Sequence, residues 1–253
     1  MAGTDSAGVP WQGRHFDHND FSGDDGSAPE RLIEAIRRFR TREVGELEVV
    51  DAFRGSRLLI PLVARLGEGD VGEHGHRIDK SAELSIVTVA GPDGRDVMPV
   101  FSSVDTMRAW NPTARPVPAD AVRVALAAAN EDTELVVLDA TSPTEFVIRR
   151  PALWAIAQSG AWKPSYLDRE VLAEFVASAE PEPAVSAVVL DAGDPDARLA
   201  GPELLVGLAV RPGLERAELD GLLSRLQERW GASPLLTARV DSMRVRVTAA
   251  SED

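Results

Sequence analysis

Apolar residues recur at helical spacing in several stretches of the chain, and the first of these stretches is well bounded. Residues 32–39 place leucine, isoleucine and phenylalanine on one face of a predicted helix. Ser27 and Glu30 have the S-x-x-E spacing of a capping box, Pro29 suits a first turn, and Gly45 suits a helix end. The same reasoning predicts further helices at residues 46–54, 103–110, 119–130, 151–160, 168–179 and 214–230.

Short β-branched and apolar runs between these helices predict strands. Residues 58–63 form a continuous apolar run that is typical of a buried strand, but Pro61 favours an edge position or a bulge because proline donates no backbone hydrogen bond. A turn sequence at residues 91–94 separates 84–90 from 97–101 and predicts a hairpin. Further strands are predicted at residues 134–140, 145–150, 184–190, 203–211 and 243–247.

The order of these elements predicts an α/β chain of the α+β type with two lobes, each a small mixed or antiparallel sheet covered by helices. The last three strands and the helix at 214–230 give the second lobe the order ββαβ. A stiff, charged spacer, Glu180-Pro181-Glu182-Pro183, precedes that lobe. The expected division is a tail at 1–26, a first domain at 27–164, a helix and linker at 165–183 and a second domain at 184–253.

The tail is rich in glycine, aspartate and serine and shows no periodicity, yet it contains three aromatic residues, Trp11, Phe16 and Phe21. Burial of one aromatic ring stabilises by about 2 kcal/mol, so exposing three of them to water is unfavourable. We therefore expect these residues to act as anchors that dock on the body of the protein or bind a partner.

Composition narrows the function classes. The chain has 253 residues, of which 44% are hydrophobic, so it can form a sizeable core. Its formal net charge of −14 repels nucleic acid and anionic membrane surfaces, and we expect neither as a partner. It has no cysteine, which excludes disulfides, thiolate nucleophiles and sulfur-ligated zinc. The first ten residues lack the basic and apolar regions of a secretory signal, which predicts a cytoplasmic location.

A series of short motifs resembles a known family. The motifs are Asp79-Lys80-Ser81, Ile86-Val87-Thr88-Val89, Gly91-Pro92-Asp93-Gly94-Arg95, Pro99-Val100-Phe101-Ser102-Ser103-Val104, Arg108-Ala109-Trp110 and Arg149-Arg150-Pro151-Ala152-Leu153. In this order they resemble the SseB family, named for enhanced serine sensitivity, in its actinobacterial form. The second lobe is similar to the family's C-terminal domain through residues 203–208 and 239–242. The resemblance implies an SseB N-terminal domain followed by an SseB C-terminal domain, and it carries over no catalytic residue.

Two local patterns raise the question of metal binding. His74 and His76 lie two residues apart in an acidic, glycine-rich loop, where imidazoles and carboxylates could hold a transition metal. A loop this rich in glycine is also typical of a solvated insertion, which we favour because a flexible loop loses entropy when it orders around a metal. Asp191, Asp194 and Asp196 lack the spacing and the terminal glutamate of a calcium loop, so we interpret them as a hairpin turn. We expect no cofactor.

Four basic residues are candidate contacts for an anionic ligand. Lys80 precedes a predicted strand, and Arg115 lies between two prolines beside Trp110. For Arg115 we favour a structural ion pair with Asp139 or Asp105 over an anion contact. Arg149 and Arg150 complete the set at the start of a helix.

No nucleophile, metal set or cofactor loop stands out, so we favour a non-catalytic binding or regulatory protein with a protein partner or a small anionic ligand. The alternative is a metal-dependent hydrolase centred on the His74/His76 loop. Self-association through the sheet edge of the second lobe is a further hypothesis.

Overall fold

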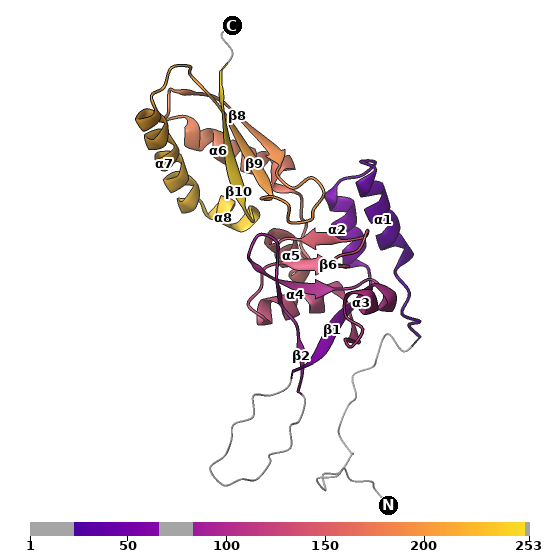
Figure 1. Cartoon of the computed structure of the whole chain (residues 1–253). Helices are drawn as coiled ribbons and strands as arrows, with labels where there is room; N and C mark the ends of the chain where they lie inside the picture. Colours follow the sequence, from indigo (N-terminus) through magenta and orange to yellow (C-terminus); the bar gives the residue numbers. More distant parts are fainter. Residues whose placement is uncertain (1–22, 66–82, 251–253) are drawn as a thin grey trace, which may run out of the picture.

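The structure is a computed structural model that describes residues 23–65 and 83–250. Two small sheets form the centre of the first lobe (Figure 1). In one, β1 (Leu58–Arg65) pairs antiparallel with both β2 (Glu83–Ile86) and β5 (Arg115–Ala119). The other has the order β3-β4-β6-β7, in which β4 and β6 are parallel and the remaining neighbours antiparallel. Its strands are β3 (Val89–Ala90), β4 (Asp96–Val100), β6 (Val136–Leu138) and β7 (Phe146–Ile148).

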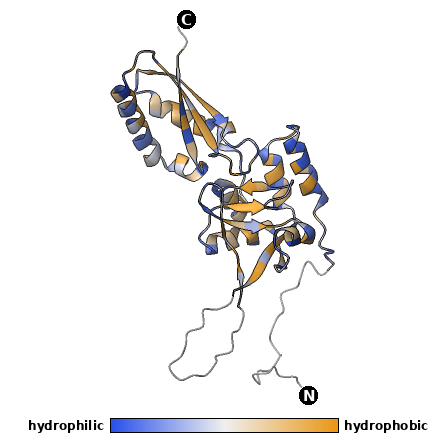
Figure 2. Ribbon diagram, viewed as in Figure 1, coloured by the Kyte–Doolittle hydropathy of each residue, from blue (hydrophilic) through white to orange (hydrophobic). Residues whose placement is uncertain are grey.

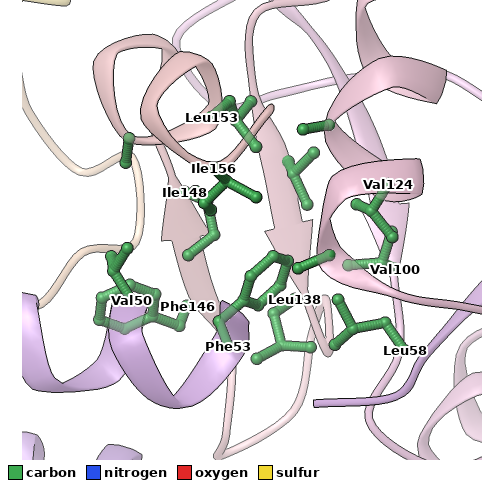
Figure 3. Packing of buried hydrophobic residues seen from close by; sticks show 14 of the residues in the cluster. Val50, Phe53, Leu58, Val100, Val124, Leu138, Phe146, Ile148, Leu153 and Ile156 are labelled. Carbon is green, nitrogen blue, oxygen red and sulfur yellow. The ribbon is translucent and has the colours of Figure 1, made fainter. Parts of the chain in front are cut away.

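Helices cover these sheets and close a core. They are α1 (Glu30–Arg40), α2 (Glu46–Arg54), α3 (Val104–Trp110), α4 (Ala121–Asn130) and α5 (Arg150–Ala157). Figure 3 shows side chains from α2, α4 and α5 meeting those of the strands, with Phe53, Phe146 and Ile156 among them. The apolar residues of this lobe concentrate on the strands, and the outer surfaces of the helices are hydrophilic (Figure 2).

The interpretation of Pro61 as an edge or bulge residue is wrong, because β1 is the central strand of its sheet. One side of β1 pairs with Phe101 at Leu59 and then with β2 from Leu62 onward. Backbone N–H groups of a strand point to the same side at every second residue, so the N–H of a residue at position 61 would point to the same side as that of Leu59. At position 61 this side lies between the pairing with Phe101 and the pairing with β2, where no partner strand needs a donor. On its other side Pro61 lies opposite Pro116 of β5. The strand therefore accepts a proline without losing a ladder hydrogen bond.

The predicted ends of α1 are also wrong. Pro29 occupies the N-cap position and makes no side-chain cap, so Ser27 does not form a capping box with Glu30. The helix ends before Arg42, whose φ of 62° takes the left-handed conformation that was expected of Gly45. Gly45 is instead the N-cap of α2.

The second lobe is a three-stranded sheet with β9 (Leu204–Val210) in the middle. β9 pairs antiparallel with β8 (Val185–Ala192) and parallel with β10 (Met243–Ala249). A short 3₁₀ helix, η1 (Ser165–Leu167), leads into it, and its helices are α6 (Arg169–Ala179), α7 (Arg216–Ala232) and α8 (Pro234–Arg239). They bury one face of β9 in a core that is separate from the core of the first lobe.

The small mixed and antiparallel sheets with their covering helices confirm the predicted α+β class, and the second lobe has the predicted ββαβ order with α8 in addition. Within residues 23–65 and 83–250, no helix combines the length and the apolar character that crossing a bilayer requires.

Candidate functional site at the junction of the lobes

The connection between β8 and β9 reaches across to the first lobe. Val147 of β7 donates a backbone hydrogen bond to the carbonyl of Ala197, and the Ala197 side chain lies in the core of the first lobe. Arg42 of the first lobe forms an ion pair with Asp196 at 2.6 Å. The aspartate-rich segment does connect two antiparallel strands, as predicted, and it also joins the lobes.

Arg149 is at the centre of this junction. It is the N-cap residue of α5, where β7 ends, and only 7% of its side chain is exposed. Its guanidinium donates to Asp194 at 2.7 Å and to Asp241 at 3.1 Å, and both carboxylates belong to the second lobe. It also donates to the carbonyl of Gly201 at 3.1 Å. Within the described residues, the hydrogen-bond acceptors of this buried guanidinium therefore all belong to the second lobe.

A second arginine of the first lobe also binds Asp241. Arg95, in the turn between β3 and β4, donates from Nη1 and Nη2 to the two oxygens of Asp241, each at 3.0 Å. Burial alone would raise the pKa of Asp241, but the guanidinium groups of Arg95 and Arg149 hold that pKa below its ordinary value. Asp241 is therefore ionised at neutral pH, and the two arginines fix the second lobe against the first.

Two further carboxyl groups lie beside Arg149 in a less polar environment. Glu203 accepts hydrogen bonds from the backbone N–H groups of Asp241 and Ser165, and burial raises its pKa. Glu46 of α2 accepts from the hydroxyl of Tyr166 at 3.2 Å. Both carboxyl groups border a cavity of about 10 Å³, close to the space that one water molecule needs.

The Glu46 carboxyl is expected to make stability depend on pH. Burial, and repulsion from Glu203, raise its pKa from 4.5 to about 7. Between these values the unfolded chain ionises while the folded chain holds a proton, so stability falls as pH rises from about 4.5 to about 7 and is level above that. Glu46→Gln should remove most of this slope and stabilise the chain at pH 8 by up to about 3 kcal/mol.

Urea unfolding between pH 4 and pH 8 measures this effect. Glu48→Gln is the matched control, because Glu48 lies on the same helical turn with an exposed side chain. It should leave the slope unchanged. An unaltered slope in Glu46→Gln would show that Glu46 titrates normally in the folded chain.

A larger hollow of about 430 Å³ opens beside the junction, between α5, the start of α6 and α8. Its polar lining consists of Trp162, Lys163, Asp168, Glu170 and Arg239. Asp168, the N-cap of α6, accepts from Lys163 and from Arg239, both at 2.9 Å. Burial alone would raise the pKa of Asp168, but these cations and the N–H of Glu170 hold it below its ordinary value.

The predicted ligand contacts lie in different places. Arg149 and Arg150 are both at the junction, where Arg150 donates to the carbonyl of Val240 at 2.6 Å. Arg115 is exposed in β5 of the first lobe and forms no ion pair within the described residues, so the expected pair with Asp139 or Asp105 is not found. Lys80 lies outside the described residues. Anion binding by Lys80, Arg115, Arg149 and Arg150 stays a prediction.

Several other predictions also fall outside the described residues. These are the tail anchors Trp11, Phe16 and Phe21 and the metal candidates His74 and His76. Among the residues that the structure does describe, no cluster of three or more histidine, aspartate or glutamate side chains could hold a metal ion. The docking of the tail and the loop metal site therefore stay predictions.

Sequence reasoning missed the acidic half of the junction and the whole hollow. Asp194 was interpreted only as a turn residue, and Asp241 and Glu203 only as parts of family motifs. Glu203 is the first residue of the predicted strand at 203–211, and Asp241 lies two residues before the predicted strand at 243–247, so a charged residue at a strand end is the one local signal for either of them.

Comparison with known proteins identifies the first lobe. The family model described as the SseB protein N-terminal domain matches residues 30–155, which run from the start of α1 into α5. No curated protein and no solved structure matches the chain. The matched segment contains Arg95 and Arg149, the two arginines that hold Asp241. Through this domain the chain belongs to the SseB family.

Proposed function

We propose that this chain is a non-catalytic binding protein and that the hollow between the lobes is its site for a small anionic ligand. The observation that supports this proposal is the contrast between the junction and the hollow. At the junction, Arg149, Asp194 and Asp241 are buried and bonded to one another, so they hold the lobes together and are not free to act as acids or bases. In the hollow, the cations are half exposed.

The hollow has the donors that an anion requires. Lys163 is 49% exposed and Arg239 43% exposed, and both are anchored on the buried carboxylate of Asp168. The hydrogen bonds of Arg239 within the described residues all use Nη1, which leaves Nε and Nη2 for a carboxylate or phosphate. Asp168 thus positions two cations side by side, and each keeps donors directed away from it.

Trp162 adds an apolar wall with an unsatisfied donor. Its indole N–H is buried and has no acceptor within residues 23–65 and 83–250. Buried donors are normally hydrogen-bonded, and Trp162 borders both the hollow and the small cavity beside Glu46. A bound molecule in either space can supply the acceptor. We therefore favour a ligand with a carboxylate or phosphate group and a small apolar part.

Ligand-observed NMR on the full chain with phosphate, acetate and succinate tests the proposal. At least one of these probes should bind, and Lys163→Ala combined with Arg239→Ala should weaken that binding at least tenfold, because a charge-assisted hydrogen bond contributes about 1.5–3 kcal/mol. Arg225→Ala is the matched control, since Arg225 is half exposed and binds Glu182 outside the hollow. Absence of binding by all three probes, or equal binding by the double variant, would refute an anion site here.

A further inference from the structure

The two edges of the second lobe's sheet differ in charge. β10 forms one edge and carries Arg244 and Arg246, both exposed. β8 forms the other edge and has no charged residue from Val185 to Leu190. Val189, in the middle of β8, is 54% exposed. Charged residues on an edge strand normally prevent pairing with another chain, and an apolar, uncharged edge promotes it.

The helix beside β8 extends this apolar edge. Leu172 and Val176, one turn apart on α6, are 37% and 43% exposed. They lie on the side of α6 that faces away from α7, because Ser178, on the opposite side, accepts a hydrogen bond from Trp230 of α7. Val176 and residues 185–188 line a groove of about 410 Å³, together with Ala179, Glu180, Glu182 and Pro183. Glu182 is neutralised there by its ion pairs with Arg225 and Arg229. The edge of β8 and the flank of α6 lie along the same margin of the lobe, with Val188 and Leu190 on the face that the helices cover and Val189 on the opposite face. We call this margin the β8 edge surface: Leu172, Val176 and residues 185–191.

We propose that two copies of the chain associate through the β8 edge surface, with β8 of one copy antiparallel to β8 of the other and the two α6 helices side by side. The sheet would then run through six strands. This proposal is independent of the anion site, which lies at the other end of α6, where Asp168 is the N-cap.

A second copy fits because the surface is complementary to itself. A two-fold axis at Val189 places Asp191 of each copy opposite Ala187 of the other, so the only charges on the strand do not meet. The same axis brings Leu172 and Val176 of one α6 against the same residues of the other. A register irregularity between Val185 and Ala187 interrupts the strand only at its beginning, so the segment around the axis is regular.

The size of the surface sets the expected strength. A strand of this length extends about 27 Å, and the flank of α6 adds to the surface beside it. Specific association begins at roughly 1,000 Å² of total buried surface, and we expect an interface made of one strand edge and one helix flank to lie near that lower limit. We therefore expect a reversible dimer with a dissociation constant in the micromolar range.

Sedimentation velocity of the full chain from about 1 to 500 μM measures the association. The unsubstituted chain should shift from monomer to dimer, and Val189→Lys and Val176→Lys should each weaken dimerisation at least tenfold. Met243→Lys is the matched control, because Met243 is 39% exposed on the opposite edge of the same sheet. Circular dichroism confirms that each variant is folded.

The absence of cysteine permits a second, positional test. Val189→Cys places a single thiol next to the proposed axis, where opposite residues of an antiparallel pair are close enough for a disulfide. Mild oxidation should convert this variant to a covalent dimer, and Met243→Cys should stay monomeric. A monomer at 500 μM, a dimer that tolerates both lysine substitutions, or equal cross-linking of the two cysteine variants would overturn the proposal.

Discussion

Replacing Arg149 by alanine is expected to lower the free energy of unfolding by about 3–5 kcal/mol, because it removes one partner of a buried ion pair and leaves the others uncompensated. Asp194 and Asp241 have side chains that are 2% and 0% exposed, so water cannot replace the guanidinium. Arg95 still binds Asp241 in the variant, but among the described residues the Asp194 carboxylate keeps only the backbone N–H groups of Arg198 and Leu199 as donors. The measurement is denaturant unfolding at pH 7.

The decrease in the free energy of unfolding should depend on the shape of the side chain at position 149 as well as on its charge. Arg149→Lys keeps one positive charge but cannot reach Asp194, Asp241 and the carbonyl of Gly201 together, so most of the loss should remain. Arg198→Ala is the control, since Arg198 is exposed and its side chain bonds only to the carbonyl of Pro143 within the described residues. A loss below 1 kcal/mol for Arg149→Ala would mean that the junction does not hold the lobes together.

The helices were predictable because the information that specifies them is local. Ser103 accepts a hydrogen bond from the N–H of Thr106 at 3.1 Å, as expected of a cap at the start of the helix at 103–110. Asp168 caps α6 in the same way at the predicted position. Among the described residues, the short helix η1 and the helix α8 were not predicted. Gly231 and Pro234 resemble the end of α7, whereas α7 continues to Ala232 and Pro234 opens the next helix.

Strand pairing was harder to predict from the sequence than the helices, since it depends on residues far apart in the chain. The apolar run at 84–90 was predicted as one strand, but its first half pairs with β1 and its last two residues pair with β4. The central position of Pro61 follows from the separate partners Phe101 and Ile86, which no local pattern specifies. The prediction of a hairpin turn at 91–94 is confirmed, because the conformation of a turn depends on its own residues. Gly94 adopts the positive φ of 83° that glycine permits.

The junction of the lobes was not predictable for the same reason, since it joins residues far apart in the sequence. Arg149 was selected from the sequence as a candidate anion contact, but its partners Asp194 and Asp241 lie 45 and 92 residues further along the chain. Nothing within a few residues of any of the three indicates that they meet. The junction is visible only after both lobes are folded.

Asp139 provides the second large expected effect, and it lies away from the junction. It follows β6 and is fully buried, with an exposure of 0%. Its carboxylate accepts from the N–H and the hydroxyl of Ser102, both at 2.7 Å, and from the hydroxyls of Thr106 and Thr144 at 3.0 and 2.8 Å. It therefore ties β6 to the start of α3, where Ser102 and Thr106 lie.

Asp139→Ala is expected to destabilise the chain by about 3–4 kcal/mol. The substitution leaves several buried donors without an acceptor, at about 1–3 kcal/mol for a group that stays unsatisfied. It also places alanine at a φ of 49°, a left-handed conformation that aspartate and asparagine tolerate better. Asp139→Asn should cost about half as much, since it keeps one acceptor oxygen and the backbone preference.

Thermal and denaturant unfolding of both variants measures this order. Asp105→Ala is the matched control, because Asp105 is an exposed carboxylate in the first turn of the same helix and should contribute less than about 1 kcal/mol. If alanine and asparagine at position 139 were equally costly, the carboxylate charge and not the number of acceptors would set the stability of this segment. If neither were costly, Asp139 would not join β6 to α3 in solution.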